Sequence, residues 1–166
     1  MNKTLSLLLL AFSPAWALAA GNHAGHDHSM AAMHQGMAHG ASGSQSGQPG
    51  DPAKVSRTIE VVMDDSMRFE PSQISVKAGE TIRFFVRNKG KKAHEMVIGN
   101  EADLQEHAAM MRKMPDMQHA DPNMIRLAAG QRGAIVWQFD KPGDVDFACL
   151  LPDHMENGMV GKVRVE

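Results

Sequence analysis

The stretch DVDFACLLPDHMENGMVGKVRV, residues 144–165, places a loop with three metal-binding side chains between two short alternating runs. Its first and last six residues alternate apolar and polar side chains, as expected of strands with one buried face. The inward positions are Val145, Phe147, Cys149, Val163 and Val165. The stretch therefore predicts two strands joined by a loop that carries Cys149, His154 and Met159.

The loop side chains have the chemistry of a mononuclear copper site. Such a site needs one thiolate, two imidazoles and usually a weak axial thioether, and the Cys-x4-His-x4-Met spacing supplies three of the four. His94 is our candidate for the fourth ligand, because it is the only histidine outside two methionine-rich segments and this loop, and it begins an apolar run. Met155 is a competing axial candidate. Each side chain alone is more often an ordinary buried or surface residue, so the prediction rests on their combination.

Working outward, the rest of residues 53–166 predicts an all-β domain. Short runs rich in Val, Ile and Phe are separated by Gly-containing turns, which is typical of an antiparallel β-sandwich. The further predicted strands cover residues 57–63, 74–76, 81–87, 95–98 and 134–139. The exception is an insertion at 101–124, where residues 102–114 favour a helix that Pro115 stops.

The N-terminal third has a different composition. Residues 1–19 predict a cleavable signal peptide, with Lys3 before an apolar run and an Ala-Leu-Ala cleavage site at 17–19. Residues 20–52 predict a disordered arm, because they lack the apolar surface needed to offset ordering. The arm's histidines are metal-capture candidates, and they are His23, His26, His28, His34 and His39. We therefore expect a periplasmic protein without a membrane span.

The composition excludes several classes. A formal net charge of −2 does not suit a nucleic-acid binder, which needs a basic face. The single Cys excludes an intrachain disulfide, a cysteine-only zinc site and a cysteine-ligated iron–sulfur cluster. Fourteen Met and nine His beside one Cys favour copper, since thioether suits Cu(I) and imidazole suits Cu(II).

The C-terminal domain resembles the cupredoxin family of plastocyanin, azurin and pseudoazurin. The resemblance rests on FEP at 69–71, ISVKAGETI at 74–82, Asn88 and GMVGKV at 158–163, and it covers about residues 55–166. It implies a Greek-key β-sandwich. The whole chain most resembles the periplasmic copper-tolerance cupredoxins of Gram-negative bacteria, which carry a His/Met-rich arm.

The resemblance implies a type 1 copper site made by His94, Cys149, His154 and Met159. One departure concerns Glu95, because many cupredoxins have at this position an Asn whose amide ties the two ligand loops together. Hydrogen bonds in the outer shell of a metal site tune it, so the colour and the potential do not follow from the resemblance.

We expect a periplasmic protein that binds copper in both oxidation states and acts in copper tolerance. A site with four protein ligands leaves no open position for a substrate, so catalysis is not the first expectation, although oxidation of Cu(I) would itself relieve toxicity. Within the insertion, Met117 and His119 are candidates for a second copper site; packing of the methionines onto the sandwich is the alternative. The alternative function is electron transfer with a periplasmic redox partner, and a copper-export partner is also open.

Overall fold

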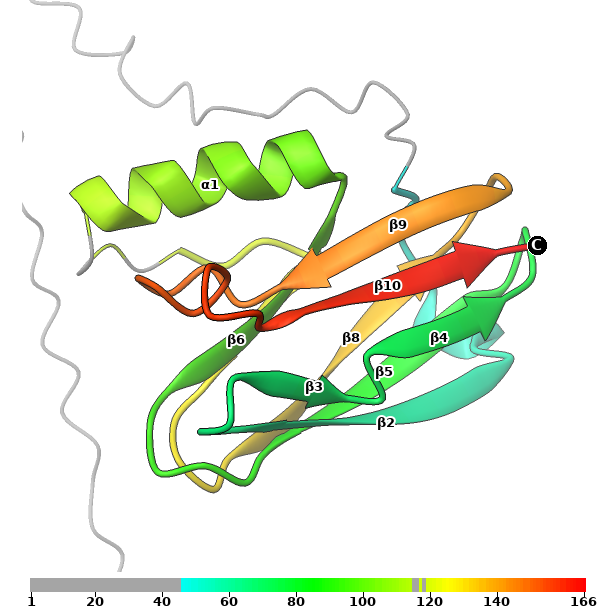
Figure 1. The fold of residues 1–166 in the computed structure, drawn as a ribbon. Helices are drawn as coiled ribbons and strands as arrows, with labels where there is room; N and C mark the ends of the chain where they lie inside the picture. Colours follow the sequence, from blue (N-terminus) through cyan, green and yellow to red (C-terminus); the bar gives the residue numbers. More distant parts are fainter. Residues whose placement is uncertain (1–45, 115–116, 118) are drawn as a thin grey trace, which may run out of the picture. The chain divides into compact units, whose positions relative to one another are not determined.

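The structure is a computed structural model that describes residues 46–114, 117 and 119–166. In this part of the chain, ten strands form two five-stranded sheets and one α-helix lies beside them (Figure 1). The strands are β1 (Gln48–Pro49), β2 (Arg57–Asp64), β3 (Arg68–Glu70), β4 (Gln73–Val76), β5 (Thr81–Asn88), β6 (His94–Gly99), β7 (Met124–Leu127), β8 (Arg132–Gln138), β9 (Gly143–Ala148) and β10 (Val160–Val165). The helix is α1 (Glu101–Lys113), and a 3-10 turn covers Pro52–Lys54.

The two sheets contain both parallel and antiparallel pairs. Their strand orders are β1-β8-β5-β2-β3 and β4-β10-β9-β6-β7. The predicted all-β sandwich with a helical insertion is confirmed, but the sheets are mixed where we expected antiparallel pairing alone. Strands β2 and β5 run parallel, as do β4 and β10. The reason is that the chain crosses between sheets, so strands adjacent in a sheet are often not consecutive in sequence.

All seven predicted strands are present, together with three that the sequence did not reveal: β1, β3 and β7. Each of these has only two to four residues, too few for a periodic pattern to stand out. The end of the expected arm also differs from the expectation. Gln48 and Pro49 pair with β8, and the Trp137 indole N–H donates to the Ser46 carbonyl at 2.6 Å. The folded domain therefore begins before residue 53, while arm residues 20–45 and the signal segment lie outside the described residues.

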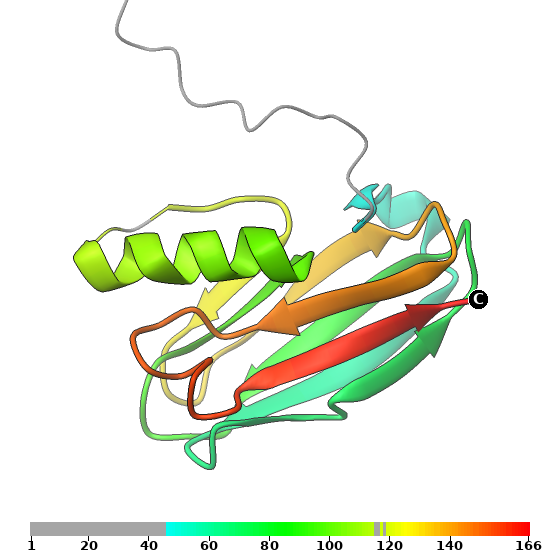
Figure 2. The same ribbon diagram turned by 45° about the horizontal axis from the view of Figure 1, so that its top comes forward.

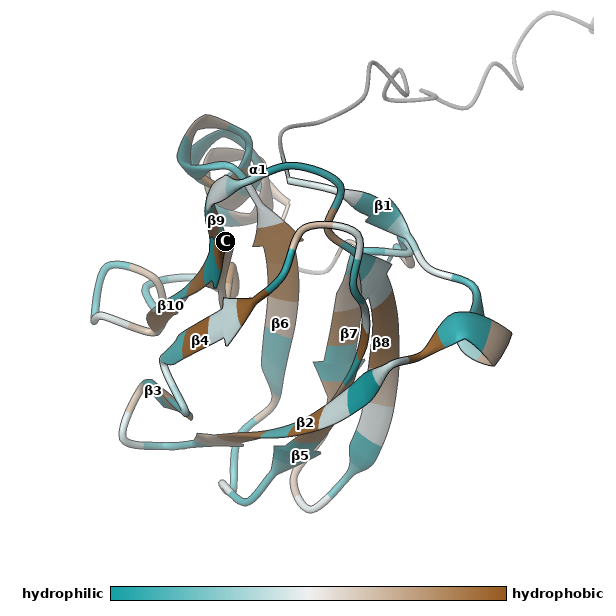
Figure 3. Ribbon diagram, turned by 90° about the vertical axis from the view of Figure 1, so that its right-hand side faces the viewer, coloured by the Kyte–Doolittle hydropathy of each residue, from teal (hydrophilic) through white to brown (hydrophobic). Residues whose placement is uncertain are grey.

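The core between the sheets is built from the alternating positions of the strands. In β5, Ile82, Phe84 and Val86 are fully buried and the residues between them are partly exposed. Phe84 packs edge-to-face on Phe139, with ring centroids 6.1 Å apart. Figure 3 shows the apolar residues along the strands, notably β4, β6 and β8. This alternation confirms the prediction that the run 81–87 has one inward face.

Strand β6 is buried on both faces. Met96 and Ile98 belong to the core between the sheets, whereas Val97 packs in a second cluster with Leu104 and Ala108 of α1. All six residues of β6 are accordingly buried. Figures 1 and 2 show α1 lying over β9 on the outer side of this sheet. The insertion therefore covers the strand that begins with His94.

Helix α1 has a defined start and a buried stripe. Asn100 caps it, since its side-chain oxygen accepts from the Asp103 N–H at 2.9 Å. Leu104, Ala108 and Met111 recur at helical spacing and are the buried residues of the helix. The observed bounds agree with the predicted helix at 102–114 to within one residue. No helix in the described part of the chain has the length and apolarity needed to cross a membrane.

Leu104→Ala tests whether α1 is an integral part of the domain. Leu104 is 2 % exposed within the helix-facing cluster. We expect its truncation to lower the free energy of unfolding by about 2–5 kcal/mol, as for other buried leucines. Urea denaturation of the metal-free protein followed by circular dichroism measures the change. Gln105→Ala, on the exposed side of the same helix, is the control and should change the value by no more than about 0.5 kcal/mol. Equal midpoints for the two variants would contradict the packing described here.

Candidate metal centre

Three side chains from two distant segments meet at one end of the sandwich. The ligating atoms of His94, Cys149 and His154 all lie within 4.8 Å of one another. The Cys149 Sγ and His154 Nδ1 atoms are 3.2 Å apart, and the rings of His94 and His154 have centroids 5.0 Å apart. In the part of the chain that the structure describes, this is the one group of His, Cys and acidic residues with metal-site geometry.

Strand pairing brings these residues together. Strands β6 and β9 are antiparallel, and Val97 is opposite Ala148. Because antiparallel strands run in opposite directions, the start of β6 lies beside the end of β9. His94 begins β6, and Cys149 follows the last residue of β9. The register therefore places a histidine from position 94 next to a cysteine 55 residues further along the chain.

The loop between β9 and β10 is closed by its own backbone. The Cys149 N–H donates to the Met159 carbonyl at 3.1 Å, and the Met159 N–H donates to the His154 carbonyl at 3.0 Å. Met159 is fully buried. These bonds hold the three predicted loop ligands in one compact unit, with Met159 joined to the other two through the main chain. Met155, the competing axial candidate, is partly buried and packs against the cluster below α1.

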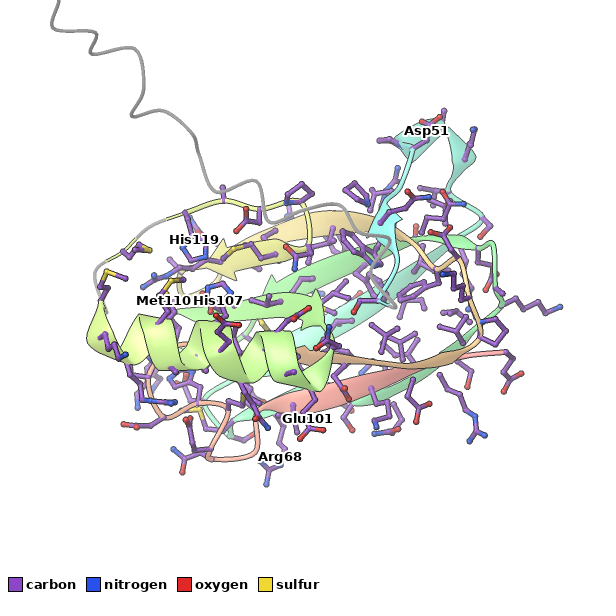
Figure 4. All side chains as sticks on the ribbon, turned by 90° about the horizontal axis from the view of Figure 1, so that it is seen from above. Asp51, Arg68, Glu101, His107, Met110 and His119 are labelled. Carbon is purple, nitrogen blue, oxygen red and sulfur yellow. The ribbon has the colours of Figure 1, made fainter. Side chains whose placement is uncertain are left out.

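An arginine of the neighbouring sheet contacts the same loop beside a glycine of the loop itself. Gly158 has a φ of 91°, which favours glycine, and a Cβ there would lie 2.7 Å from Nη1 of Arg68. Arg68, labelled in Figure 4, donates from this nitrogen to the Asn157 carbonyl at 3.0 Å. Strand β3, which the sequence did not reveal, therefore contributes to the position of the ligand loop.

The donor set fits copper. His94 is fully buried, and its Nδ1 atom has no hydrogen-bond partner among the described residues. A buried polar atom without a partner is costly unless a ligand satisfies it. Together with one soft thiol sulfur and a second imidazole, this free nitrogen forms the combination that copper prefers.

Burial controls the protonation of the metal-free cluster. It raises the pKa of the Cys149 thiol to about 12, against the weaker opposing effect of the Glu95 N–H. Burial also lowers the pKa of His154, and the neighbouring His94 lowers it further. The thiol is therefore protonated and the His154 imidazole neutral at pH 7. Metal binding must displace the thiol proton, because thiolate is the metal-binding form.

Glu95 links the ligand loop to β6. Its backbone N–H donates to Cys149 Sγ at 3.4 Å, and its carboxylate accepts from the Leu150 N–H at 3.1 Å. The side chain is 1 % exposed, and burial raises the pKa of its carboxyl group. The departure noted at this position is therefore accompanied by a connection of its own, which the buried carboxyl group of Glu95 makes to the ligand loop.

Asp65, in the turn between β2 and β3, contacts the opposite side of His94. Its Oδ1 atom lies 3.1 Å from Nε2 of the imidazole. The Lys91 N–H and then the His94 ring hold the pKa of Asp65 at about 2. Sequence analysis did not identify Asp65 because 28 residues separate it from His94 and no local motif connects them.

The second predicted pair, Met117 and His119, lines a pocket of about 310 Å³. Glu95 and Met124 contribute to the same lining. The two ring nitrogens of His119 are buried and have no hydrogen-bond partner among the described residues, although Nε2 lies 3.8 Å from an Asp121 carboxylate oxygen. The structure thus brings the two predicted residues to one cavity, with Glu95 between this cavity and Cys149.

Other donors of the insertion lie near this pocket. Figure 4 shows His107 of α1 close to His119, and the rings of these two residues have centroids 4.7 Å apart. Met111 is 1 % exposed and Met114 is exposed. Met111 belongs to the buried face of α1 and also lines the pocket with Met117 and His119. The arm histidines predicted to capture metal, His23 to His39, lie outside the described residues.

Comparisons with known proteins agree with this geometry. The family model described as copper binding proteins, plastocyanin/azurin family, matches residues 55–166. The copper-resistant cuproprotein CopI of Rubrivivax gelatinosus is 53 % identical over 165 residues, covering 99 % of this chain and 98 % of the relative. A protein of the same name from Pseudomonas aeruginosa is 35 % identical over 155 residues, covering 76 % of this chain and 85 % of the relative.

Solved structures show the same fold. Reduced auracyanin from Roseiflexus castenholzii is 26 % identical with a TM-score of 0.57, and the match covers 68 % of this chain and 98 % of that one. Auracyanin B, at 22 % identity, has a TM-score of 0.61, with 73 % and 96 % covered. The family match covers strands β2 to β10, including the loop that carries Cys149, His154 and Met159. The chain belongs to the plastocyanin/azurin family of copper-binding proteins.

Proposed function

We propose that this protein is exported to the periplasm, binds copper there and protects the cell from it. The observation that carries the proposal is the convergence of His94, Cys149 and His154, with the Nδ1 atom of His94 buried and unpaired. The names of the CopI relatives, which describe copper-resistant cuproproteins, support the role in tolerance. The N-terminal segment, with the pattern of a cleavable signal peptide, supports export.

In this proposal, His94, Cys149, His154 and Met159 hold one copper ion. Copper bound there supplies a centre that one electron converts between Cu(I) and Cu(II). The chain contributes the thiolate, two imidazole nitrogens and a buried thioether, and the loop backbone keeps them in place. Because His94, Cys149 and Met159 are fully buried, the surroundings exclude water from most of the site.

We also propose a second copper site at Met117 and His119. A thioether and an imidazole from one pocket can take either oxidation state of copper. The pocket lies below α1 and shares Glu95 with the ligand loop. The histidines of the arm, His23, His26, His28, His34 and His39, would capture further ions.

Oxidation of Cu(I) is a second candidate activity, favoured by the position of Glu95. This residue lines the pocket and donates its N–H to Cys149 Sγ, so the bonds of Glu95 and one hydrogen bond connect the pocket to the thiolate. A captured Cu(I) ion would lose one electron and become Cu(II), and a periplasmic redox partner would take the electron. Electron transfer alone remains the alternative function, and it requires only the site at His94, Cys149, His154 and Met159.

Cys149→Ser tests the ligand set and the protective role together. Cys149 is the only cysteine of the chain, so we expect complete loss of the visible sulfur-to-copper absorption and a lower copper tolerance. Absorption spectroscopy of the Cu(II)-loaded variant measures the first effect. Growth on rising copper of a gene-deleted strain that expresses the variant measures the second. Gln105→Ala is the control in both experiments. Colour in the serine variant would refute the ligand set. Unchanged tolerance after gene deletion would refute the protective role and leave electron transfer.

Copper affinity should rise with pH. The Cys149 thiol, with its pKa of about 12, keeps its proton in the metal-free protein, and binding releases it. One released proton makes the apparent affinity increase about tenfold per pH unit between pH 7 and 9. Competition against a chelator of known pH dependence measures the slope of log affinity against pH. The Cys149→Ser substitution should lower this slope by about one. A wild-type slope equal to that of the variant would show that the thiol is already ionised.

Counting bound copper tests the additional sites. The double variant Met117→Ala/His119→Ala should bind about one ion fewer per chain and keep the absorption of the thiolate site. Met114→Ala is the matched control, because Met114 belongs to the same segment but is exposed and does not line the pocket. Deletion of residues 21–45 should remove the ions bound by the arm while sparing Ser46, which contacts Trp137. One ion per wild-type chain would contradict both additional sites.

A further inference from the structure

The turn between β2 and β3 places a carboxylate, that of Asp65, against His94 of the candidate metal site. Asp65 Oδ2 accepts from the Lys91 N–H at 2.8 Å, and Oδ1 accepts from the Lys92 N–H at 3.2 Å. Gly90 closes over the same group, since a Cβ there would lie 2.3 Å from Oδ1. The backbone of the turn at residues 89–92, which precedes His94, therefore fixes the carboxylate of Asp65 in one orientation.

The same carboxylate defines which nitrogen of His94 is available to a metal. Asp65 Oδ1 lies 3.1 Å from Nε2 of the imidazole, and an ionised carboxylate only accepts hydrogen bonds. The ring proton of neutral His94 is therefore assigned to Nε2. The Nδ1 atom is left with its lone pair, buried and unpaired, and His94 has a ring nitrogen within 4.8 Å of the Cys149 and His154 donors.

A carboxylate in this position also changes the electronic balance of the site. An imidazole that donates its second N–H to a carboxylate becomes a more basic metal ligand. The negative charge stabilises Cu(II) more than Cu(I), because the attraction grows with the charge on the metal. The Asp65 side chain is exposed to water on one side, but the His94 ring that it contacts is fully buried, so water does not separate the carboxylate from the ring.

We propose that Asp65 is a positioning residue that directs Nδ1 of His94 to the metal and biases the site toward Cu(II). The inference rests on the proposed copper binding by His94, Cys149, His154 and Met159. A site biased in this way has a lower midpoint potential than the same ligands would give without the carboxylate. It retains copper as Cu(II) in the presence of mild reductants, which suits capture better than rapid electron exchange.

The first test is Asp65→Asn in the full mature chain loaded with copper. The amide oxygen can still accept from Nε2 of His94, but the negative charge is lost. We expect the preference for Cu(II) over Cu(I) to fall about tenfold, which raises the midpoint potential by about 59 mV for one electron. Spectroelectrochemistry on the visible sulfur-to-copper band measures the shift.

Asp153→Asn is the matched control. Asp153 is exposed, directly precedes His154 and has a φ of 67°, a conformation that asparagine tolerates. This substitution removes an equal charge near the other imidazole, and we expect a smaller shift from it. Equal shifts in the two variants would overturn the specific role of Asp65, as would an unchanged potential in Asp65→Asn.

The second test needs no copper. In the metal-free protein, ¹H–¹⁵N spectroscopy of the histidine rings should show His94 protonated at Nε2, and Asp65→Ala should give a mixture of both tautomers. An unchanged tautomer in a folded Asp65→Ala variant would refute the positioning role. The tests distinguish failure of this inference from failure of the proposed function. Absence of a Cys149-dependent copper band in the wild-type protein would refute copper binding at this site. A normal band, with no change of potential or tautomer on substitution of Asp65, would refute only this inference.

Discussion

The antiparallel register of β6 and β9 is the constraint on which the convergence of His94, Cys149 and His154 depends. Val97 is opposite Ala148, so the first residue of β6 lies beside the point where the chain leaves β9. The Glu95 N–H and carboxylate then bond to Cys149 Sγ and to the Leu150 N–H. A shift of one residue in this pairing would reverse which side chains of β6 face the core. His94 would then point away from Cys149, and Glu95 would enter the space between the sheets.

The buried acid is an unusual way to make this connection. Burying a carboxyl group is costly unless it is hydrogen-bonded or neutral, and the raised pKa of Glu95 reflects that cost. One hydrogen bond to the Leu150 N–H offsets part of it. The opposite side of the cluster differs, because Asp65 is partly exposed, receives two backbone N–H groups and has a pKa of about 2. The pKa of one carboxyl group beside His94 is therefore raised, and the pKa of the other is lowered.

Much of this architecture could be predicted from local sequence. Each strand of four or more residues with a clear alternation was predicted, as was α1, whose buried residues recur at helical spacing. The ligand loop was predictable because Cys149, His154 and Met159 are close in sequence and chemically distinctive. His94 could be paired with them by its position at the start of a strand. Strands β1, β3 and β7 were missed because their formation depends on a partner strand more than on their own few residues.

The contacts of Asp65, Arg68 and Glu95 could not be predicted for a related reason. Each depends on segments that are distant in sequence and meet only in the folded sheets: Asp65 with His94, Arg68 with Asn157, and Glu95 with Cys149. Strand pairing from a single sequence does not define which turn approaches which loop. The departure at Glu95 was visible in the sequence, but its compensating bond to Leu150 was not. The residues that tune a metal site are in this respect harder to predict than the ligands they support.

The insertion joins the packing of the sandwich to the proposed second copper site. It connects β6 to β7, so its helix covers the strand that begins with His94. Met111 is buried on the helix and lines the same pocket as Met117 and His119, which lie beyond the helix end. An ion pair between Arg112 and Glu156 joins the last turn of α1 to the ligand loop. Because that loop contributes three of the proposed copper ligands, the helix that provides the second pocket also helps to position the first site.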